Sequence, residues 1–413
     1  MYKQETVVTL ADVQAARARL GAAIYCSPCA YSETTSRIAG VRVFFKLDNL
    51  QMTGSFKERG ALNKLLSLKP DERKTGVIAA SAGNHGLAVA FHAQRLGIPA
   101  TIVMPRFAPL IKVSWARRYG AEVILAGADF DEALAEAQRL QRERGSLFIP
   151  AFNDPEVIAG QGTLGLEILE QTPGLDAVLI PVGGGGLIGG IALALKQSGF
   201  SGRVIGVQAE RVAGMRAALE AGHPVSLPPA TTIADGIAVR RVGDLTFPLA
   251  QQYVDTLITV SDAEIARAIL FLLENEKTVV EGAAATTLAA LLNRPLGLDG
   301  KTVVLVLSGG NIDVNVVARV IEKGLVQEGR LVRLRLIIPD RPGALARVSS
   351  LVADQGANIQ EIVHTRGLSQ AEIGESEITL TLETSGMQHI AEVRAVLQTA
   401  GYRVFEERPG SVV

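Results

Sequence analysis

One lysine stands in a stretch that could make its amine reactive. Lys57 lies in Thr53-Gly54-Ser55-Phe56-Lys57-Glu58-Arg59-Gly60-Ala61, which follows a strand-like run at residues 43–47. A lysine held where a strand gives way to a helix can lose its solvation, and burial lowers the pKa of an ammonium group. A neutral amine attacks carbonyl groups and forms Schiff bases. The alternative is an ordinary exposed lysine in a first helical turn, and this stretch alone does not separate the two.

Three further motifs follow predicted strands and could bind charged groups. Ser81-Ala82-Gly83-Asn84-His85-Gly86 opens a predicted helix, so its backbone N–H groups could hold a carboxylate, although a tight turn would look the same. Gly183-Gly184-Gly185-Gly186-Leu187 lets several amides converge on one phosphate. It lacks the lysine and hydroxyl residue of a P-loop and the spacing of a dinucleotide motif. Ser308-Gly309-Gly310-Asn311 brings a hydroxyl to a third strand end.

The elements that must position these motifs alternate between strand and helix. Predicted strands lie at residues 41–47, 76–80, 100–104, 122–125, 177–181, 203–208, 257–260 and 302–307. Predicted helices lie at residues 9–20, 56–68, 84–96, 110–119, 129–144, 187–197, 212–221 and 262–275. This alternation is typical of βαβ units. It predicts an α/β fold of two parallel-sheet subdomains, with ligands at the carboxyl ends of the strands.

The pattern changes after a short polar stretch at residues 324–330. Predicted strands at 331–338, 359–365, 377–383 and 402–406 enclose predicted helices at 343–354 and 388–399. The resulting β-α-β-β-α-β order is the ferredoxin-like α+β pattern. It indicates a separate C-terminal domain.

Composition narrows the functional class. The 413 residues are 48% hydrophobic and 20% charged, which suits a well-cored protein of two or three domains. The net charge of −1, without a basic block, argues against nucleic acid or an anionic membrane as partner. Residues 177–195 are uncharged, but Pro181 and the four glycines favour strand, loop and helix over a membrane span. No signal-peptide pattern is visible.

The two cysteines, Cys26 and Cys29, form a C-x-x-C pair. Such a pair can be a redox dithiol or half of a zinc site, but no second cysteine pair exists to complete the zinc site. Packing of two small side chains beside Pro28 is the favoured interpretation.

With these motifs in order, the chain resembles the fold-type II pyridoxal-phosphate-dependent enzymes, and among them the threonine dehydratases (threonine ammonia-lyases). The resemblance spans residues 34–321. Besides the motifs above, it is carried by Lys46-Leu47-Asp48-Asn49-Leu50-Gln51, Ala234-Asp235-Gly236 and Glu281-Gly282-Ala283. Asp340-Arg341-Pro342-Gly343-Ala344-Leu345 resembles the start of an ACT domain, a small amino-acid-sensing module. The implied boundaries are 1–323 for the catalytic domain, with a smaller subdomain at about 46–155, and 331–413 for the ACT domain.

The resemblance also implies roles for individual residues. Lys57 would bind pyridoxal phosphate covalently and then act as base on the substrate Cα. The remaining cofactor residues would be Phe56 on the ring, Asn84 at the phenolic oxygen, Gly183, Gly184, Gly185, Gly186 and Leu187 at the phosphate, and Ser308 at the pyridine nitrogen. The substrate carboxylate would lie among Ser81, Ala82, Gly83, Asn84 and His85. Effector contacts in the ACT domain would come from Asp340, Gly343, Ala344, Leu345 and Asn358.

Two departures from the family pattern qualify these expectations. Similar serine racemases carry a serine where this chain has Ala82, so racemisation is not expected. Glu210 matches one member of the family's cation site, but Arg216 stands where a second carboxylate is expected. Glu210 is therefore only a candidate cation ligand, and no metal is expected with it.

The implied function is elimination of ammonia from L-threonine to give 2-oxobutanoate, with L-serine, which gives pyruvate, as a second substrate. A branched-chain amino acid is the expected effector, the expected assembly is a dimer or tetramer, and the expected location is the cytoplasm. Two alternatives stay open. One is a serine dehydratase, a racemase or another enzyme of the fold, such as cysteine or threonine synthase. The other is a non-catalytic amino-acid sensor.

Overall fold

The computed structural model describes residues 8–366 and 371–407 and divides into two units, residues 1–312 and 313–413. Within the described residues, the first unit holds two sheets. The larger sheet has the strand order β1-β2-β10-β7-β8-β9. Its strands are β1 (Cys29–Ser32), β2 (Arg42–Leu47), β7 (Ala177–Pro181), β8 (Arg203–Ala209), β9 (Thr256–Val260) and β10 (Thr302–Leu307). All neighbours pair in parallel except β1, which pairs antiparallel with β2.

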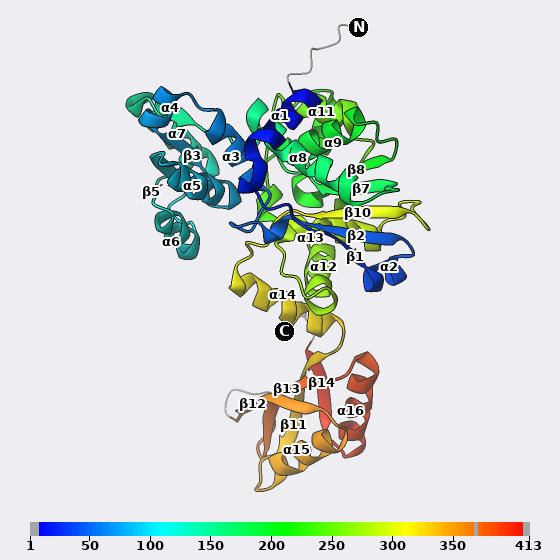
Figure 1. Cartoon of the computed structure of the whole chain (residues 1–413). Coiled ribbons are helices and arrows are strands. Elements are labelled where there is room, and N and C mark those ends of the chain that lie inside the picture. The colour runs from blue at the N-terminus through cyan, green and yellow to red at the C-terminus, as the bar shows by residue number, and fades with distance from the viewer. Residues whose placement is uncertain (1–7, 367–370, 408–413) are drawn as a thin grey trace. The chain divides into compact units, whose positions relative to one another are not determined.

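Helices cover both faces of this sheet. Figure 1 shows α8 and α9 on one side of it and α12 and α13 on the other. The helices of this larger part are α1 (Leu10–Leu20), α2 (Glu33–Ala39), α8 (Pro155–Gln171), α9 (Gly186–Gln197), α10 (Gly214–Ala221), α11 (Thr246–Tyr253), α12 (Asp262–Asn275) and α13 (Gly282–Asn293). Buried aliphatic side chains of β7, β8, β10, α8 and α9 form its core. Because both faces are buried, the central strands β7 and β10 are nearly continuous apolar runs rather than alternating.

The second sheet of the first unit has the order β5-β4-β3-β6 and is parallel throughout. Its strands are β3 (Val77–Ala80), β4 (Ala100–Met104), β5 (Glu122–Leu125) and β6 (Leu147–Phe148). The helices around it are α3 (Lys57–Ser67), α4 (Pro70–Thr75), α5 (Asn84–Leu96), α6 (Leu110–Arg118) and α7 (Phe130–Arg144). The α/β prediction is therefore confirmed, with one correction: β1 adds an antiparallel edge to the larger sheet. Its four residues carry too weak a strand signal to predict.

A buried ionic network fixes helix α3, the helix that begins at Lys57. Arg59 is 1% exposed and bonds Asp48 through Nε at 2.7 Å and Glu167 of α8 through Nη1 at 2.6 Å. Lys46 of β2 also pairs with Glu167. Burial alone would raise the pKa of Asp48, but the adjacent Arg59 guanidinium brings that pKa below its ordinary value. Since a buried ion pair is strongly destabilised when one partner is lost, this network holds α3 in one position against α8.

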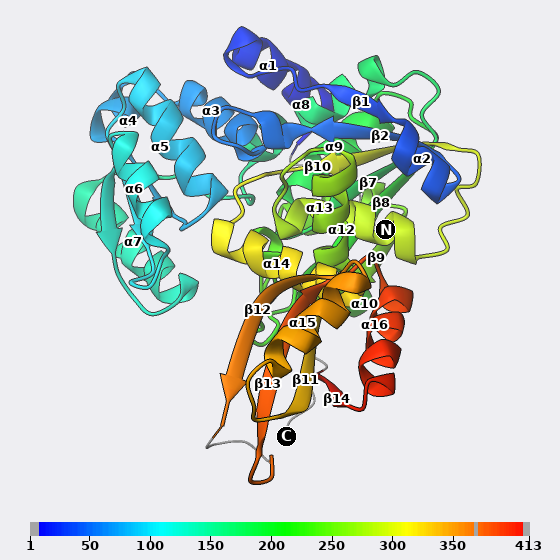
Figure 2. The same ribbon diagram turned by 90° about the horizontal axis from the view of Figure 1, so that it is seen from below.

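The C-terminal unit begins with α14 (Val314–Gln327) and continues as an antiparallel sheet of order β12-β13-β11-β14. Its elements are β11 (Leu331–Pro339), α15 (Ala344–Asp354), β12 (Asn358–Thr365), β13 (Glu375–Glu383), α16 (Met387–Thr399) and β14 (Arg403–Glu407). Figure 2 shows the four strands with α15 and α16. Buried apolar side chains of β11, β13, α15 and α16 form a core of their own. The predicted ferredoxin-like order is confirmed.

Two smaller expectations are also resolved. Among the described residues, no helix combines the length and the apolar character that crossing a membrane requires. Both cysteines are free thiols, Cys29 partly buried against the core and Cys26 exposed. The packing interpretation therefore holds for Cys29 only.

Candidate active site

Lys57 is the first residue of α3, and its side chain is partly buried. Nζ donates to the carbonyl oxygen of Ala151 at 2.8 Å and lies 5.0 Å from the centre of the Phe56 ring. Burial lowers the pKa of Lys57 to about 8, and the negative charge of Glu281 acts in the opposite direction. About a tenth of the amine is therefore neutral, and nucleophilic, at pH 7, which is far more than for a lysine of ordinary pKa.

Backbone contacts bring the start of α3 beside Ser308. The N–H of Phe56 donates to the Ser308 carbonyl at 2.9 Å, and Ser55 pairs with Gly309 as a short antiparallel bridge. Ser308 follows β10 and is 1% exposed. Within the described part of the chain, its hydroxyl has no hydrogen-bond partner. A buried hydroxyl without a partner is costly, so Ser308 is suited to a polar group supplied by a ligand.

The glycines before α9 stand where no side chain fits. A Cβ at Gly184 would lie 2.5 Å from the Phe152 ring, and a Cβ at Gly186 would lie 2.9 Å from Phe152 Cβ. Gly185 adopts a left-handed conformation with φ of +97°, and its Cβ would lie 2.6 Å from Thr246 Oγ1. Glycine is thus required here by both space and backbone conformation.

The amides of this loop are available to an anion. The carbonyl of Gly184 accepts from Thr246 Oγ1 at 2.6 Å and from the N–H of Gly243 at 3.2 Å. By contrast, none of the hydrogen bonds among the described residues uses the N–H groups of residues 183–187. Free amides at the start of a helix form a phosphate site.

A second set of amides lies at the start of α5, after β3. The helix begins at Asn84, and no side chain caps it. The N–H of Gly83 donates to Ser81 Oγ at 3.1 Å, whereas those of Ala82, Asn84 and His85 have no partner within the described residues. The predicted carboxylate-binding motif is thus present as a strand-to-helix turn with free donors.

The ring of His85 is neutral in this site. Burial, and then the charge of Lys57, lower the pKa of His85 to about 3. Because its Nε2 lies 2.8 Å from the carbonyl oxygen of Ile149, Nε2 carries the proton and Nδ1 is an acceptor. An acceptor repels a carboxylate, so any role for His85 in carboxylate binding comes from its backbone.

Glu281 belongs to the site, although the sequence analysis assigned it no role. Its side chain is buried, and both of its oxygens accept from Nδ2 of Asn84 at 2.9 Å. Nδ2 of Asn311 donates to Oδ1 of Asn84 at 2.8 Å. Glu281 and Asn84 both belong to motifs that carry the family resemblance, but they are 197 residues apart in the sequence. Their pairing could be found only in three dimensions.

The buried carboxylate of Glu281 predicts a pH-dependent stability. Burial raises its pKa from 4.5 to about 7, and the charge of Asp235 adds to this, while Asn84, Lys112 and Lys57 oppose it. Since the folded pKa exceeds the unfolded one, the contribution of Glu281 to stability is lost as the pH rises from about 4.5 to about 7. Glu281→Gln removes this dependence. We expect the cofactor-free variant to gain up to about 3 kcal/mol over the parent at pH 8, and much less at pH 5.

Urea unfolding of both proteins between pH 5 and 8 measures this difference. Parallel pH curves for the parent and the variant would show that Glu281 does not titrate in this range.

The cofactor that the resemblance implies, pyridoxal phosphate, fits these residues. The site offers an amine of lowered pKa at Lys57, a set of free amides at residues 183–187 and an unpartnered hydroxyl at Ser308. The parallel strands β7 and β10 are neighbours, so the glycine loop and Ser308 emerge at the same edge of the sheet. The amides would hold the phosphate, Ser308 the pyridine nitrogen, and Lys57 the aldehyde carbon.

The predicted effector residues lie at two ends of the C-terminal sheet. Asp340 follows β11, and its Oδ1 lies 3.1 Å from Nε of Arg366, with which it forms an ion pair. Asn358 starts β12 and donates to Glu383, which is opposite the first residue of β11. Gly343, Ala344 and Leu345 form the start of α15 next to Asp340. Within one chain Asn358 therefore does not join the other four residues, because β11 separates the two ends.

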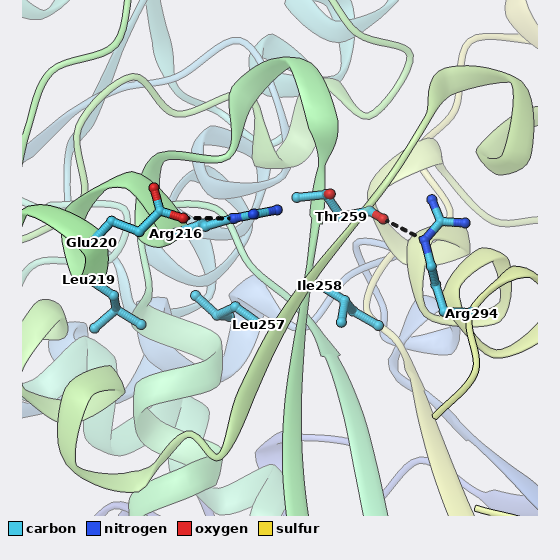
Figure 3. A pocket seen from close by; sticks show the side chains of 7 residues that line it. All are labelled: Arg216, Leu219, Glu220, Leu257, Ile258, Thr259 and Arg294. Atoms are coloured by element: carbon cyan, nitrogen blue, oxygen red, sulfur yellow. Dashed lines mark hydrogen bonds and ion pairs between the residues drawn. The ribbon is translucent and has the colours of Figure 1, made fainter. Parts of the chain in front are cut away.

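Glu210 lies outside this constellation. It is exposed, directly after β8, and its charge helps to raise the pKa of Arg294. The described residues contain no group of three or more histidine, cysteine or acidic side chains arranged for a metal. A hollow of about 460 Å³ lies between α10 and β9, with Arg216 paired to Glu220 on one wall and Arg294 on the other (Figure 3). No predicted cofactor or substrate residue lines it.

Comparisons with known proteins find matches for both parts of the chain. Residues 21–309 match the family described as "Pyridoxal-phosphate dependent enzyme", and residues 332–397 match the ACT domain. The chain is 49% identical to an L-threonine ammonia-lyase of Thermotoga maritima, over 96% of this chain and 99% of that protein. It is 42% identical to the L-threonine dehydratase catabolic TdcB of Escherichia coli, over 76% of this chain and 96% of that protein. Among solved structures, maize serine racemase has a TM-score of 0.73 at 34% identity, over 78% of this chain and 99% of that one.

Proposed function

The chain belongs to the family of pyridoxal-phosphate-dependent enzymes, and from this premise we propose that it deaminates L-threonine to 2-oxobutanoate and ammonia. L-Serine, which would give pyruvate, is the second substrate. The observation that carries the proposal is the amine of Lys57, held with a lowered pKa at the helix start that Ser308 abuts. Pyridoxal phosphate, when bound, supplies an electron sink that acidifies the Cα proton of an amino acid.

The residues of the chain perform the remaining tasks. The free amides at the start of α5 hold the substrate carboxylate and so orient Cα toward Lys57. The Lys57 amine takes the Cα proton, since its pKa of about 8 suits a base at neutral pH. Ser308 would meet the pyridine nitrogen of the bound cofactor with a neutral hydroxyl. Such a partner would not favour a proton on that nitrogen, and this would favour loss of the β-hydroxyl, which must be protonated to leave as water.

The alternatives fit the site less well. A racemase needs a proton donor on the second face of Cα, and Ala82, at the position where similar racemases carry serine, has no exchangeable proton. A pure amino-acid sensor would not need the reactive amine of Lys57 or the unpartnered hydroxyl of Ser308. Steady-state assays of 2-oxo-acid release from L-threonine, L-serine and D-serine, each combined with measurement of racemised substrate, test the assignment. Racemisation faster than 2-oxo-acid release would overturn it.

We propose in addition that the ACT domain binds a branched-chain amino acid and regulates the enzyme. Truncation after Glu328, the C-cap of α14, is expected to retain threonine deamination and to lose any response to isoleucine or valine. In the comparison with the E. coli relative, 76% of this chain matches 96% of that protein. This match supports a catalytic unit that functions without the ACT domain. The assay is 2-oxobutanoate release with and without each amino acid.

A second truncation, after Ile312, removes α14 as well and tests whether that helix belongs with the catalytic unit. If the Glu328 truncation is soluble, binds pyridoxal phosphate and is inactive, the ACT domain completes the active site instead of regulating it.

Exposed apolar side chains and free thiols bear on the assembly and the location of the protein. Phe107 and Leu110 are each 83% exposed, and exposed apolar side chains of this kind often lie in interfaces. A homodimer or homotetramer is therefore proposed, which light scattering after size exclusion measures. The two free thiols agree with a cytoplasmic location, since that compartment is reducing.

A further inference from the structure

Glu281 occupies a place that its local structure does not explain. It is the N-cap residue of α13, yet its side chain makes no capping hydrogen bond to that helix. The side chain is 4% exposed, and both carboxylate oxygens face Nδ2 of Asn84 at 2.9 Å. Burial of a carboxylate is unfavourable unless it serves an interaction. Here the interaction that it serves is with Asn84.

Two glycines keep the space for this pair. A Cβ at Gly309 would lie 2.5 Å from Glu281 Oε1 and 3.1 Å from Asn84 Nδ2, and a Cβ at Gly236 would lie 3.2 Å from the same oxygen. Neither glycine has a positive φ, so backbone conformation does not demand glycine at either position. A side chain at Gly309 would displace the carboxylate, and one at Gly236 would crowd both the carboxylate and Ala283.

The amide of Asn84 is held at both ends. Its Oδ1 accepts from Asn311 Nδ2 at 2.8 Å, and the same Nδ2 donates to the carbonyl of Thr53 at 2.7 Å. Above pH 7, where Glu281 is mostly ionised, its carboxylate only accepts, and the Asn311 amide nitrogen only donates. The two neighbours then fix which end of the Asn84 amide is the donor. The two oxygens of one carboxylate subtend a small angle at Nδ2, so one hydrogen serves both. The second hydrogen of Nδ2 stays available.

We propose that Glu281 is a positioning residue, which orients the Asn84 amide so that Asn84 presents an N–H donor to the phenolic oxygen of pyridoxal phosphate. The proposal rests on the proposed cofactor site. Without Glu281 the amide can turn and present its carbonyl oxygen, which repels the phenolic oxygen. The charge of Glu281 also faces Lys57, Lys112 and Asp235. A purely electrostatic role is therefore the rival explanation, and the test must separate the two.

The test measures the dissociation constant of pyridoxal phosphate and the absorption maximum of the bound cofactor in full-length protein. The variants are Glu281→Ala, Glu281→Gln, Asn84→Ala and the double variant of Asn84→Ala with Glu281→Ala. Glu281→Ala is expected to shift the absorption maximum and to weaken binding about tenfold, because one hydrogen bond to a charged group contributes on that scale. Glu281→Gln keeps an acceptor and is expected to weaken binding less than about threefold. In the Asn84→Ala background, Glu281→Ala is expected to add nothing.

Each other outcome overturns the proposal. Equal effects of Glu281→Ala with and without Asn84 would show that Glu281 acts independently of the amide. Equal losses in the Gln and Ala variants would assign the role to charge. No loss in Glu281→Ala would remove the role altogether.

If Glu281→Ala does not fold, Asn311→Ala provides the second test, since it removes the other restraint on the same amide. Its effect on the absorption maximum should likewise vanish in the Asn84→Ala background, and persistence of that effect counts against the proposal. A parent protein that binds no pyridoxal phosphate would instead refute the proposed function.

Discussion

Replacing Lys57 with alanine is expected to abolish threonine deamination. The rate should fall at least about a thousandfold, because a positioned acid–base group contributes on that scale. The variant loses both the group that would bind pyridoxal phosphate covalently and the base that would take the Cα proton. Reduction of the loaded protein with borohydride, followed by mass measurement, tests the covalent attachment directly. The parent should retain the cofactor mass after denaturation, and Lys57→Ala should not.

The fold of this variant should survive. Burial lowers the pKa of Lys57 from 10.5 to about 8, so its contribution to stability is unfavourable at pH 7 and is recovered only as the pH rises from about 8 to about 10.5. Cofactor-free Lys57→Ala is therefore expected to be at least as stable as the parent at pH 7. Lys69→Ala, which removes an exposed lysine just after the same helix, is the matched control and should keep full activity. Cofactor mass retained by borohydride-treated Lys57→Ala would place the attachment at another lysine.

The position of Lys57 shows what local sequence can predict. The turn at Thr53-Gly54, the strand before it and the helix after it are all local features, and the structure starts α3 at Lys57. The same is true of α5, which begins and ends as its sequence pattern predicts, between Gly83 and the left-handed Gly97. Motifs that pair a strand end with a helix start are therefore readable before the structure is known.

Helices whose sequence signal conflicts with their packing were not predictable. Helix α8 runs for 17 residues but contains three glycines, which lower helix propensity. Those glycines allow close packing: a Cβ at Gly160 would lie 2.7 Å from the Cα of Gly60 in α3. Helix α13 was missed for another reason, since it is buried on most sides and lacks an amphipathic period. In both helices tertiary packing, rather than local propensity, decides the structure.

The same limit applies to the site. Free backbone amides can be predicted from glycines and helix starts in the sequence. The pairing of Asn84 with Glu281 cannot, because it depends on how two subdomains meet. The C-terminal domain shows a similar limit, because the sequence predicted both Asp340 and Asn358 as effector residues but did not predict how one chain would place them. Their strands carry them to separate ends of the sheet, where each has a partner of its own.

Replacing Ser308 with aspartate is expected to leave pyridoxal phosphate bound but to reduce threonine deamination by about a hundredfold, because one preorganised group alters catalysis on that scale. Ser308 is 1% exposed and its hydroxyl has no partner within the described residues, so a carboxylate placed there would find only the pyridine nitrogen to pair with. Such a pair would keep a proton on that nitrogen. Charge at Cα would then be stabilised by the ring, and the drive to expel the β-hydroxyl would weaken.

Ser308→Ala is the control that separates electronics from contact. It removes the hydroxyl without adding a charge, so it should weaken cofactor binding modestly and reduce deamination less than Ser308→Asp does. Cofactor content from the absorption spectrum, and kcat on threonine measured at saturating pyridoxal phosphate, distinguish lost binding from lost chemistry. Deamination by Ser308→Asp at the parental rate would show that the residue facing the nitrogen does not govern elimination. Equal losses in both variants would mean that the hydroxyl matters only as a contact. The difference in kcat between Ser308→Asp and Ser308→Ala therefore measures how far the neutral hydroxyl of Ser308 favours elimination.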